Sequence, residues 1–245
     1  MEQDILGSYM QRAKIEQDII PVLVNTAGRR DLVEHVVSHE FLDLSMIYAV
    51  IPEKRMEVDG EFSVITPYMA KQLRFSNEDL YSLAERNMKR RMPVGCFSLE
   101  TWLEYRLREI GAYTGPSQEG RSLGRFSPPI YLLKNEKNCF GATVLVYQDP
   151  IRDLADRLGE NLFLLPSSIH EVIAVPESME CSAEELAQIV RQVNREMVGP
   201  QDYLSDHVYY YDRDQRHLTL AQEEAQKEIE PEDRFRDNTR RKKGR

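Results

Sequence analysis

The residues best suited to chemistry lie in one short stretch: Ser167, Ser168, His170 and Glu171. Apolar runs flank this stretch at residues 162–165 and 172–175. Two apolar runs joined by a polar turn predict a pair of strands with a tight connection, which would gather the four polar side chains in one place. A nucleophilic serine needs a base within hydrogen-bond reach, and the base needs an orienting carboxylate. Residues 167–171, the hinge, are therefore a candidate hydrolase site.

A purely structural interpretation of the hinge competes with this one, and we favour it. Side chains alternate between faces along a strand, so Ser168 and His170 would share a side while Glu171 points away from them. No Gly-x-Ser-x-Gly elbow exposes either hydroxyl. We expect the serines to satisfy backbone groups of the turn, and we assign no catalytic residue.

A second candidate site is the aromatic run of Tyr209, Tyr210 and Tyr211, with His207 just before it. Alternation along a strand buries either Tyr210 or its two neighbours and leaves the other face aromatic and exposed. Such a face is typical of a partner-binding surface, but also of an amphipathic edge strand. We name His207, Tyr209 and Tyr211 as candidate binding residues, and both interpretations stay open.

Metal and cofactor sites are not predicted. His35 and His39 are four residues apart, but they do not form a His-Glu-x-x-His pattern and instead indicate the surface end of a helix. Arginines around residues 113–129 lack a glycine-rich phosphate-binding motif. We expect no cofactor and no metal ligand.

Composition sets the class of protein. The chain has 245 residues, of which 41% are hydrophobic and 30% charged, as in a soluble globular protein. No apolar run approaches the roughly 20 residues of a membrane helix, and no secretory signal opens the chain. Three widely spaced cysteines indicate reduced thiols and a cytoplasmic location. A net charge of −9 argues against broad nucleic-acid binding by the folded body.

The order of elements predicts an α+β fold. Residues 1–112 read as a smaller mixed α/β part, and residues 113–129 are a loop or linker rich in Gly, Pro and Ser. Residues 130–220 read as ββ-α-ββ-α-ββ, with strands that include 140–147. Short hairpin connections favour antiparallel pairing, which gives one antiparallel sheet with helices on one face.

The last segment, residues 221–245, is almost wholly charged or polar, acidic at first and basic at its end. It has too little apolar surface to offset the entropy of ordering, so we expect a disordered, solubilising tail. Its terminal basic cluster offers an alternative role, contact with a nucleic acid or an acidic protein patch.

Four segments together resemble an uncharacterised family of cytoplasmic proteins from Gram-positive gut anaerobes, labelled only as a domain of unknown function. They are Leu42–Tyr48, Asn77–Asn87, Leu165–Ile173 and Leu204–Tyr209. The most specific part is Leu-Pro-Ser-Ser-Ile-His-Glu-Val, and the resemblance covers roughly residues 15–220. Members carry further sequence ahead of this start, so we expect the chain to be short at its N-terminus. The resemblance implies no activity, cofactor or catalytic residue.

Without a closed catalytic constellation, the sequence favours a non-catalytic protein that acts by binding another protein. The alternatives are a hydrolase that uses the hinge and a protein that contacts nucleic acid through its tail. The sequence leaves the oligomeric state and the partner open.

Overall fold

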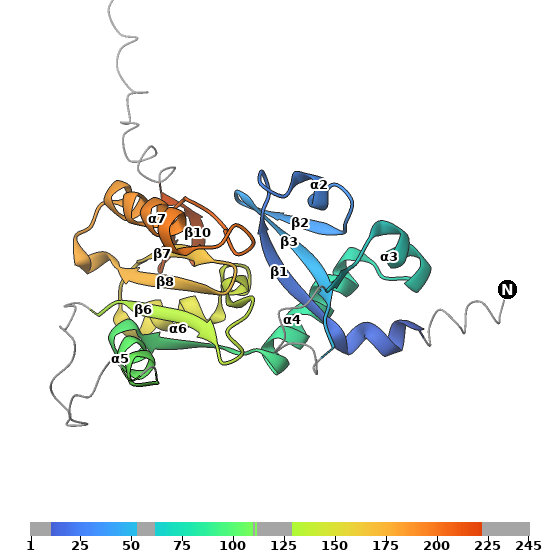
Figure 1. Cartoon of the computed structure of the whole chain (residues 1–245), viewed down its shortest axis with the longest axis horizontal. Helices are drawn as coiled ribbons and strands as arrows, with labels where there is room; N and C mark the ends of the chain where they lie inside the picture. Colours follow the sequence, from blue (N-terminus) through green and yellow to red (C-terminus); the bar gives the residue numbers. More distant parts are fainter. Residues whose placement is uncertain (1–10, 53–61, 110, 112–128, 222–245) are drawn as a thin grey trace, which may run out of the picture.

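The computed structural model describes residues 11–52, 62–109, 111 and 129–221 (Figure 1). Two antiparallel sheets stand side by side, so the α+β class predicted from the sequence is confirmed. The helices and 3₁₀ helices include η1 (Glu16–Asp18), α2 (Arg30–Val33), α3 (Pro67–Leu73), α4 (Asn77–Arg91), α5 (Leu99–Glu109), η3 (Gly141–Leu145), α6 (Asp149–Leu158), η4 (Glu177–Met179) and α7 (Ala183–Met197). None of the helices in these ranges is long and apolar enough to cross a membrane.

The smaller sheet has four strands, with β1, β3 and β2 in that order and β4 paired to β3. They are β1 (Ile19–Asn25), β2 (Ser38–Phe41), β3 (Leu44–Val50) and β4 (Ser63–Val64). The apolar runs of β1 and β3 pair in register, with Ile20 opposite Ala49. Both strands are buried along nearly their whole length because α4 and α2 contribute to the clusters around them. β2 was not predicted, since its polar sequence reads as the end of a helix.

The larger sheet has six strands in the order β10-β9-β7-β8-β6-β5. They are β5 (Val94–Ser98), β6 (Tyr131–Asn135), β7 (Leu162–Ser168), β8 (Glu171–Pro176), β9 (Tyr209–Asp212) and β10 (His217–Leu220). Of the three strand hairpins predicted in this part, two are present: β7 pairs with β8, and β9 pairs with β10. The edge strand β5 was not predicted, and it joins this sheet from the part of the chain that precedes residue 113.

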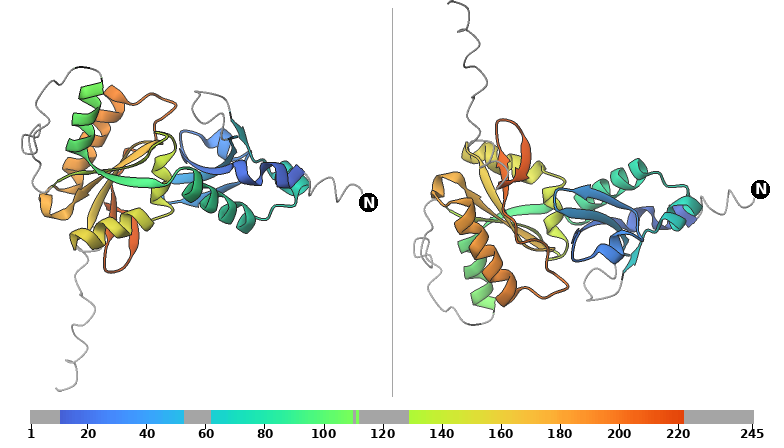
Figure 2. Two further views of the ribbon diagram at one scale, coloured as in Figure 1. Left: turned by 90° about the horizontal axis from the view of Figure 1, so that it is seen from below. Right: turned by 90° about the horizontal axis from the view of Figure 1, so that it is seen from above.

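Helices cover both faces of the larger sheet, which corrects the expectation that they share one face. Ile151 and Leu154 of α6 pack with Leu164 on one face, while Leu186 of α7 packs with Leu165 on the other. Figure 2 shows α6 on one side of the sheet and α5 with α7 on the opposite side. The reason is that consecutive residues of β7 are both apolar, so both faces of the strand need cover.

The predicted strand at 140–147 is wrong: the structure has the 3₁₀ helix η3 there. Phe140 takes a left-handed conformation with φ of 54° and turns the chain out of an extended path. Gly141 then donates its N–H to the carbonyl oxygen of His170 at 3.0 Å. A Cβ on Gly141 would lie 2.3 Å from that oxygen, so the contact requires glycine. All five residues of η3 are buried, which is why the run is apolar without alternating.

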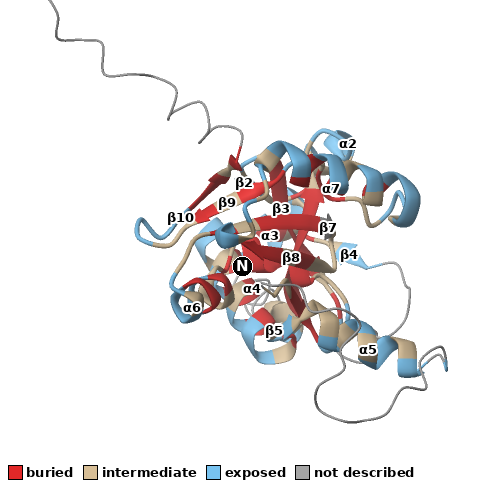
Figure 3. Ribbon diagram, turned by 90° about the vertical axis from the view of Figure 1, so that its left-hand side faces the viewer, coloured by how far each residue is buried: buried red, intermediate tan, exposed pale blue. Residues whose placement is uncertain are grey.

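Short local sequence patterns set the ends of several helices. Capping boxes open α4, between Ser76 and Asp79, and α7, between Ser182 and Glu185. Gly159 ends α6 with φ of 78°. Figure 3 shows the central strands, such as β3, β7 and β8, buried and the outer faces of the helices exposed. The Asp59-Gly60 pair, a dipeptide typical of a tight turn, lies outside the described residues, as do residues 222–245 of the tail and most of the 113–129 loop.

Candidate functional site

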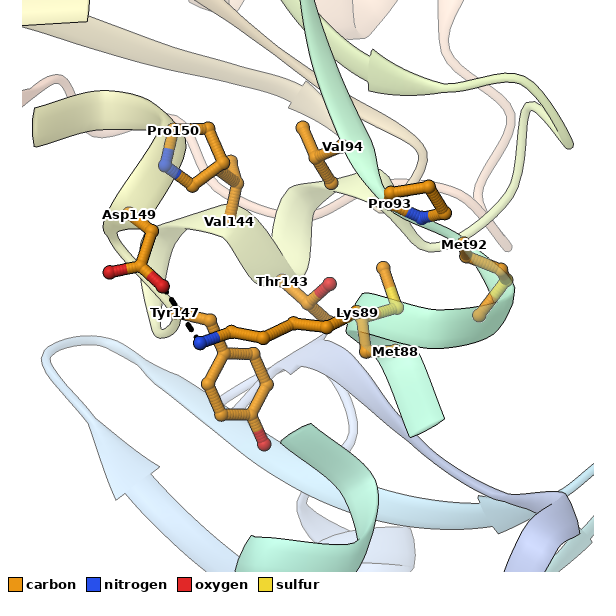
Figure 4. A pocket seen from close by; sticks show the side chains of 10 residues that line it. All are labelled: Met88, Lys89, Met92, Pro93, Val94, Thr143, Val144, Tyr147, Asp149 and Pro150. Carbon is orange, nitrogen blue, oxygen red and sulfur yellow. Dashed lines mark hydrogen bonds and ion pairs between the residues drawn. The ribbon is translucent and has the colours of Figure 1, made fainter. Parts of the chain in front are cut away.

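A pocket of about 160 Å³ opens between the end of α4 and the start of α6 (Figure 4). Its deeper side chains are buried and largely apolar, whereas Lys89 and Pro93 at the mouth are exposed. Two prolines shape it, since Pro93 follows the end of α4 and Pro150 stands in the first turn of α6. The lining residues are Met88, Lys89, Met92, Pro93, Val94, Thr143, Val144, Tyr147, Asp149 and Pro150.

The polar groups of the deeper lining are already satisfied elsewhere. Thr143 donates its hydroxyl to the carbonyl of Phe140 at 2.8 Å. The Tyr147 hydroxyl reaches the Met46 sulfur at 3.6 Å, and Figure 4 shows it directed away from Val94. Burial raises the pKa of Tyr147, with smaller contributions from neighbouring tyrosines, so the phenol stays neutral. The pocket therefore offers an occupant apolar surface and few free hydrogen-bonding groups.

An ion pair stands at the mouth of the pocket. Lys89 Nζ lies 2.7 Å from Asp149 Oδ2 and 2.9 Å from Glu85 Oε1. The hydrogen bond with Asp149 raises the pKa of Lys89, and the same bond lowers the pKa of Asp149. Both side chains of the Lys89–Asp149 pair are about half exposed, so water screens the pair and a ligand could open it at small cost.

The hinge connects β7 to β8 as predicted, but its described side chains hold the turn together. Ser168 Oγ accepts the backbone N–H of His170 at 3.1 Å. The His170 ring accepts the backbone N–H of Phe140 at Nδ1, 3.4 Å away, and its Nε2 lies 3.2 Å from Asp202 Oδ1. Both ring nitrogens therefore have partners other than Ser168, and the ring is not placed to activate that hydroxyl.

Glu171 does not lie on the side of the sheet that simple alternation along one strand would give it. The strand ends at Ser168 and residues 169 and 170 form a turn, so Ser168 stands directly opposite Glu171 on the neighbouring strand. Opposite residues of an antiparallel pair share a face, whereas the expectation put Glu171 on the other side from Ser168. The turn also packs on the loop after α7, because Ile169 donates its N–H to the carbonyl of Asp202 at 2.9 Å.

A second polar cluster, centred on Asp43, joins the two sheets. Ser205 Oγ donates to Asp43 Oδ2 at 2.6 Å, and His207 Nδ1 lies 2.9 Å from the same oxygen. The Tyr209 hydroxyl donates to Asp43 Oδ1. Ser205 is 1% exposed, so its hydroxyl is a structural donor and not an accessible nucleophile. Sequence reasoning named His207 and Tyr209 but missed this cluster, because Asp43 is more than 160 residues away in sequence and gives no local sign of the contact.

In the aromatic run, the two tyrosines named as binding residues point into the core. Tyr209 and Tyr211 are 0% and 1% exposed, respectively, and both belong to the main core. Tyr210 is the partly exposed residue, and its hydroxyl donates to Glu177 at 2.8 Å. The exposed binding face expected of Tyr209 and Tyr211 is therefore wrong, because the face of β9 that carries them packs into the main core with Ile151 and Leu154 of α6. Only His207 of that set has a partly exposed side chain.

The histidine pair considered for a metal is split between elements. His39 lies in β2, while His35 follows α2 and contacts the carbonyl of Asp31 at 2.7 Å. In the described ranges, no group of three or more His, Cys, Asp or Glu side chains is arranged to hold a metal ion.

Comparison with known proteins adds a family but no activity. A family model described as "Family of unknown function (DUF5688)" matches residues 2–213. The chain belongs to this family. No curated protein and no solved structure matches it. Within the described residues, the α4–α6 pocket of about 160 Å³ offers mostly apolar walls to an occupant.

Proposed function

We propose that this DUF5688 protein is a non-catalytic binding protein that takes one apolar side chain of another protein into the α4–α6 pocket. The observation that carries the proposal is the size and lining of the pocket, about 160 Å³ with mostly apolar walls. A cavity of about 150 Å³ holds a molecule the size of benzene, whereas small-molecule sites usually span roughly 300–1,000 Å³. The space thus suits one leucine, methionine or phenylalanine side chain.

The chemistry of the walls supports an adaptable anchor site. Met88 and Met92 present flexible, polarisable thioethers, which fit apolar side chains of different shapes. Protein interfaces commonly concentrate their affinity in one buried anchor surrounded by polar groups. Lys89 and Asp149 at the mouth supply one cation and one anion, which can orient a charged partner. Because their own ion pair is half exposed, opening it for the partner costs little.

Selection from a random decapeptide display library on the full chain tests the proposal. Enriched peptides should share an apolar residue, and Val94→Phe, which fills the pocket from its wall, should weaken their binding about tenfold or more. Ile189→Phe is the matched control, because Ile189 is 53% exposed on α7 and does not line the pocket. No enrichment, or equal binding to Val94→Phe, would reject the proposal, provided circular dichroism shows both variants folded.

A cytoplasmic location is part of the same proposal. Cys96, Cys139 and Cys181 are all free thiols, which supports a reducing compartment. The hydrolase alternative gains no support from the hinge, since His170 is turned toward Asp202 and Phe140. The nucleic-acid alternative rests on the tail, outside the described residues.

A further inference from the structure

We infer that the partner segment binds as an extended strand added to the free edge of β5, a statement that rests on the proposed function of the pocket. β5 is the last strand of the six-stranded sheet and pairs on one side only, with β6. Strand addition to such an edge gives affinity through main-chain hydrogen bonds and selectivity through alternate side chains.

The register of β5 fixes which backbone groups face outward. Leu99 donates its N–H to the carbonyl of Ile130 at 2.9 Å, so these two residues form a hydrogen-bonded pair. Hydrogen-bonded pairs alternate along an antiparallel ladder, so Phe97 and Gly95 also bond to β6. The N–H and C=O groups of Val94 and Cys96 therefore point to the free edge, and no turn or loop of the described residues bonds to them. The Ser98 carbonyl is not part of this free edge, because α5 begins at the next residue and the carbonyl before a helix accepts its first hydrogen bond.

The sequence of β5 lacks the usual protection of an edge. Its five residues, Val-Gly-Cys-Phe-Ser, include no charge and no proline, although natural edge strands commonly carry one or the other. By contrast, β1 contains Pro21 and β2 contains Glu40, so these edges of the smaller sheet carry such residues. An uncharged edge with outward-facing amides suits a pairing strand.

The pocket is continuous with this edge through one residue. Val94 lines the pocket with its side chain (Figure 4), while the register of β5 directs its backbone N–H and C=O groups to the free edge. A residue directly opposite Val94 on an added strand would project its side chain to the same face, toward the pocket. The next side chain along that strand would project to the other face, where Phe97 is 41% exposed.

Charge beside the pocket specifies the partner further. Arg157 Nη2 lies 3.3 Å from Cys96 Sγ, and its guanidinium carbon lies 5.7 Å from the centre of the Tyr131 ring, with no carboxylate paired to Arg157 among the described residues. A partner residue opposite Cys96 would meet this cation. The matching segment therefore carries an apolar residue and, two positions away, Asp or Glu. A second copy pairing through β5 would instead bring two Arg157 side chains together, which is unfavourable.

Two variants of Cys96 separate strand addition from pocket binding. Cys96→Pro removes an N–H that faces outward, so it blocks an added strand and spares the bonds to β6. Cys96→Val keeps the N–H and serves as its control. Against a peptide enriched on the full chain, we expect Cys96→Pro to weaken binding about tenfold or more and Cys96→Val to change it less than about threefold, measured by fluorescence anisotropy. Both variants are first checked for wild-type melting.

Backbone N-methylation of the same peptide gives a readout that needs no change in the protein. Methylation of the two peptide residues that pair with β5, which lie two positions apart, should abolish binding. In a separate selection on Arg157→Glu, the enriched peptides should carry Lys or Arg in place of the acidic residue. Peptides that bind Cys96→Pro as they bind the wild type, but do not bind Val94→Phe, would overturn the inference of strand addition and keep the proposed pocket binding. A concentration-dependent dimer that Cys96→Pro disrupts would show that a second copy pairs with the edge, and it would overturn the inference. Peptide binding that appears only after residues 112–128 are cut would show that the chain itself occupies the edge, and it would overturn the inference as well.

Discussion

Asp43 and Ser205 are 162 residues apart in sequence, and the Ser205 hydroxyl donates to the Asp43 carboxylate at 2.6 Å. Asp43 lies in the turn between β2 and β3, and Ser205 lies in the loop that leads from α7 to β9. The bond thus fastens the smaller sheet to the larger one. Asn25 reinforces the same junction, because its side-chain amide donates to the carbonyl of Leu204 at 2.8 Å.

Replacing Asp43 by Ala should destabilise the fold by about 2–5 kcal/mol. The substitution leaves the buried hydroxyls of Ser205 and Tyr209 without their acceptor, and each unsatisfied group costs about 1–3 kcal/mol. Urea unfolding measures the change. Asp153→Ala is the control, since that carboxylate is 69% exposed, and its unfolding midpoint should match that of the wild type. Equal midpoints for both variants would show that the junction carries no stability.

Gly141→Ala tests the close approach of η3 to the hinge. The new Cβ would lie 2.3 Å from the His170 carbonyl oxygen, so the backbone must move, and we expect a loss of about 1–3 kcal/mol or more. Gly199→Ala is the matched control because its Cβ would meet its nearest neighbour, Asp202, at an ordinary 3.7 Å. Thermal melts of both proteins provide the comparison. A control as unstable as the test variant would contradict the steric explanation.

The hinge should be structural. Ser168→Ala removes the acceptor of the His170 N–H, and we expect a cost of about 0.5–1.5 kcal/mol in urea unfolding. A fluorophosphonate probe should not label the wild-type protein, since the His170 ring is occupied by Asp202 and Phe140. Labelling that disappears in both Ser168→Ala and His170→Ala would make the hinge a catalytic centre and remove the non-catalytic proposal.

The Lys89–Asp149 ion pair at the mouth of the pocket should stabilise the fold slightly at neutral pH, and this contribution should be lost in acid. The bond from Lys89 lowers the pKa of Asp149 in the folded state, so the pair stabilises the fold above the unfolded carboxyl pKa, near 4. This contribution is lost as the pH falls through the folded pKa. Asp149 is 47% exposed, which limits the effect to below about 1 kcal/mol.

Unfolding of the wild type and of Asp149→Asn, compared at about pH 6 and about pH 2.5, measures that effect. The wild type should be the more stable protein at the higher pH, and the difference should shrink in acid. A difference of the same size at both pH values would mean that the charge of Asp149 contributes nothing.

Local sequence determined the helix boundaries and two hairpins of this protein. Ser76, Ser182 and Gly159 act on the few residues next to them, so their caps are readable without a fold. The turn between β7 and β8 is equally local. For the same reason the alternation of Tyr209 to Tyr211 was recognised, although not which face would be buried.

Tertiary structure alone decided the rest, because the contacts join residues that carry no local sign of one another. The run 140–147 is apolar like a strand, but η3 is buried on all sides and held by the hinge backbone, so it needs no alternation. One face of β9 packs into the main core against α6, and this packing buries Tyr209 and Tyr211. The pocket exists only because the end of α4 and the start of α6 meet, and Val94 connects it to a free strand edge that the sequence did not indicate.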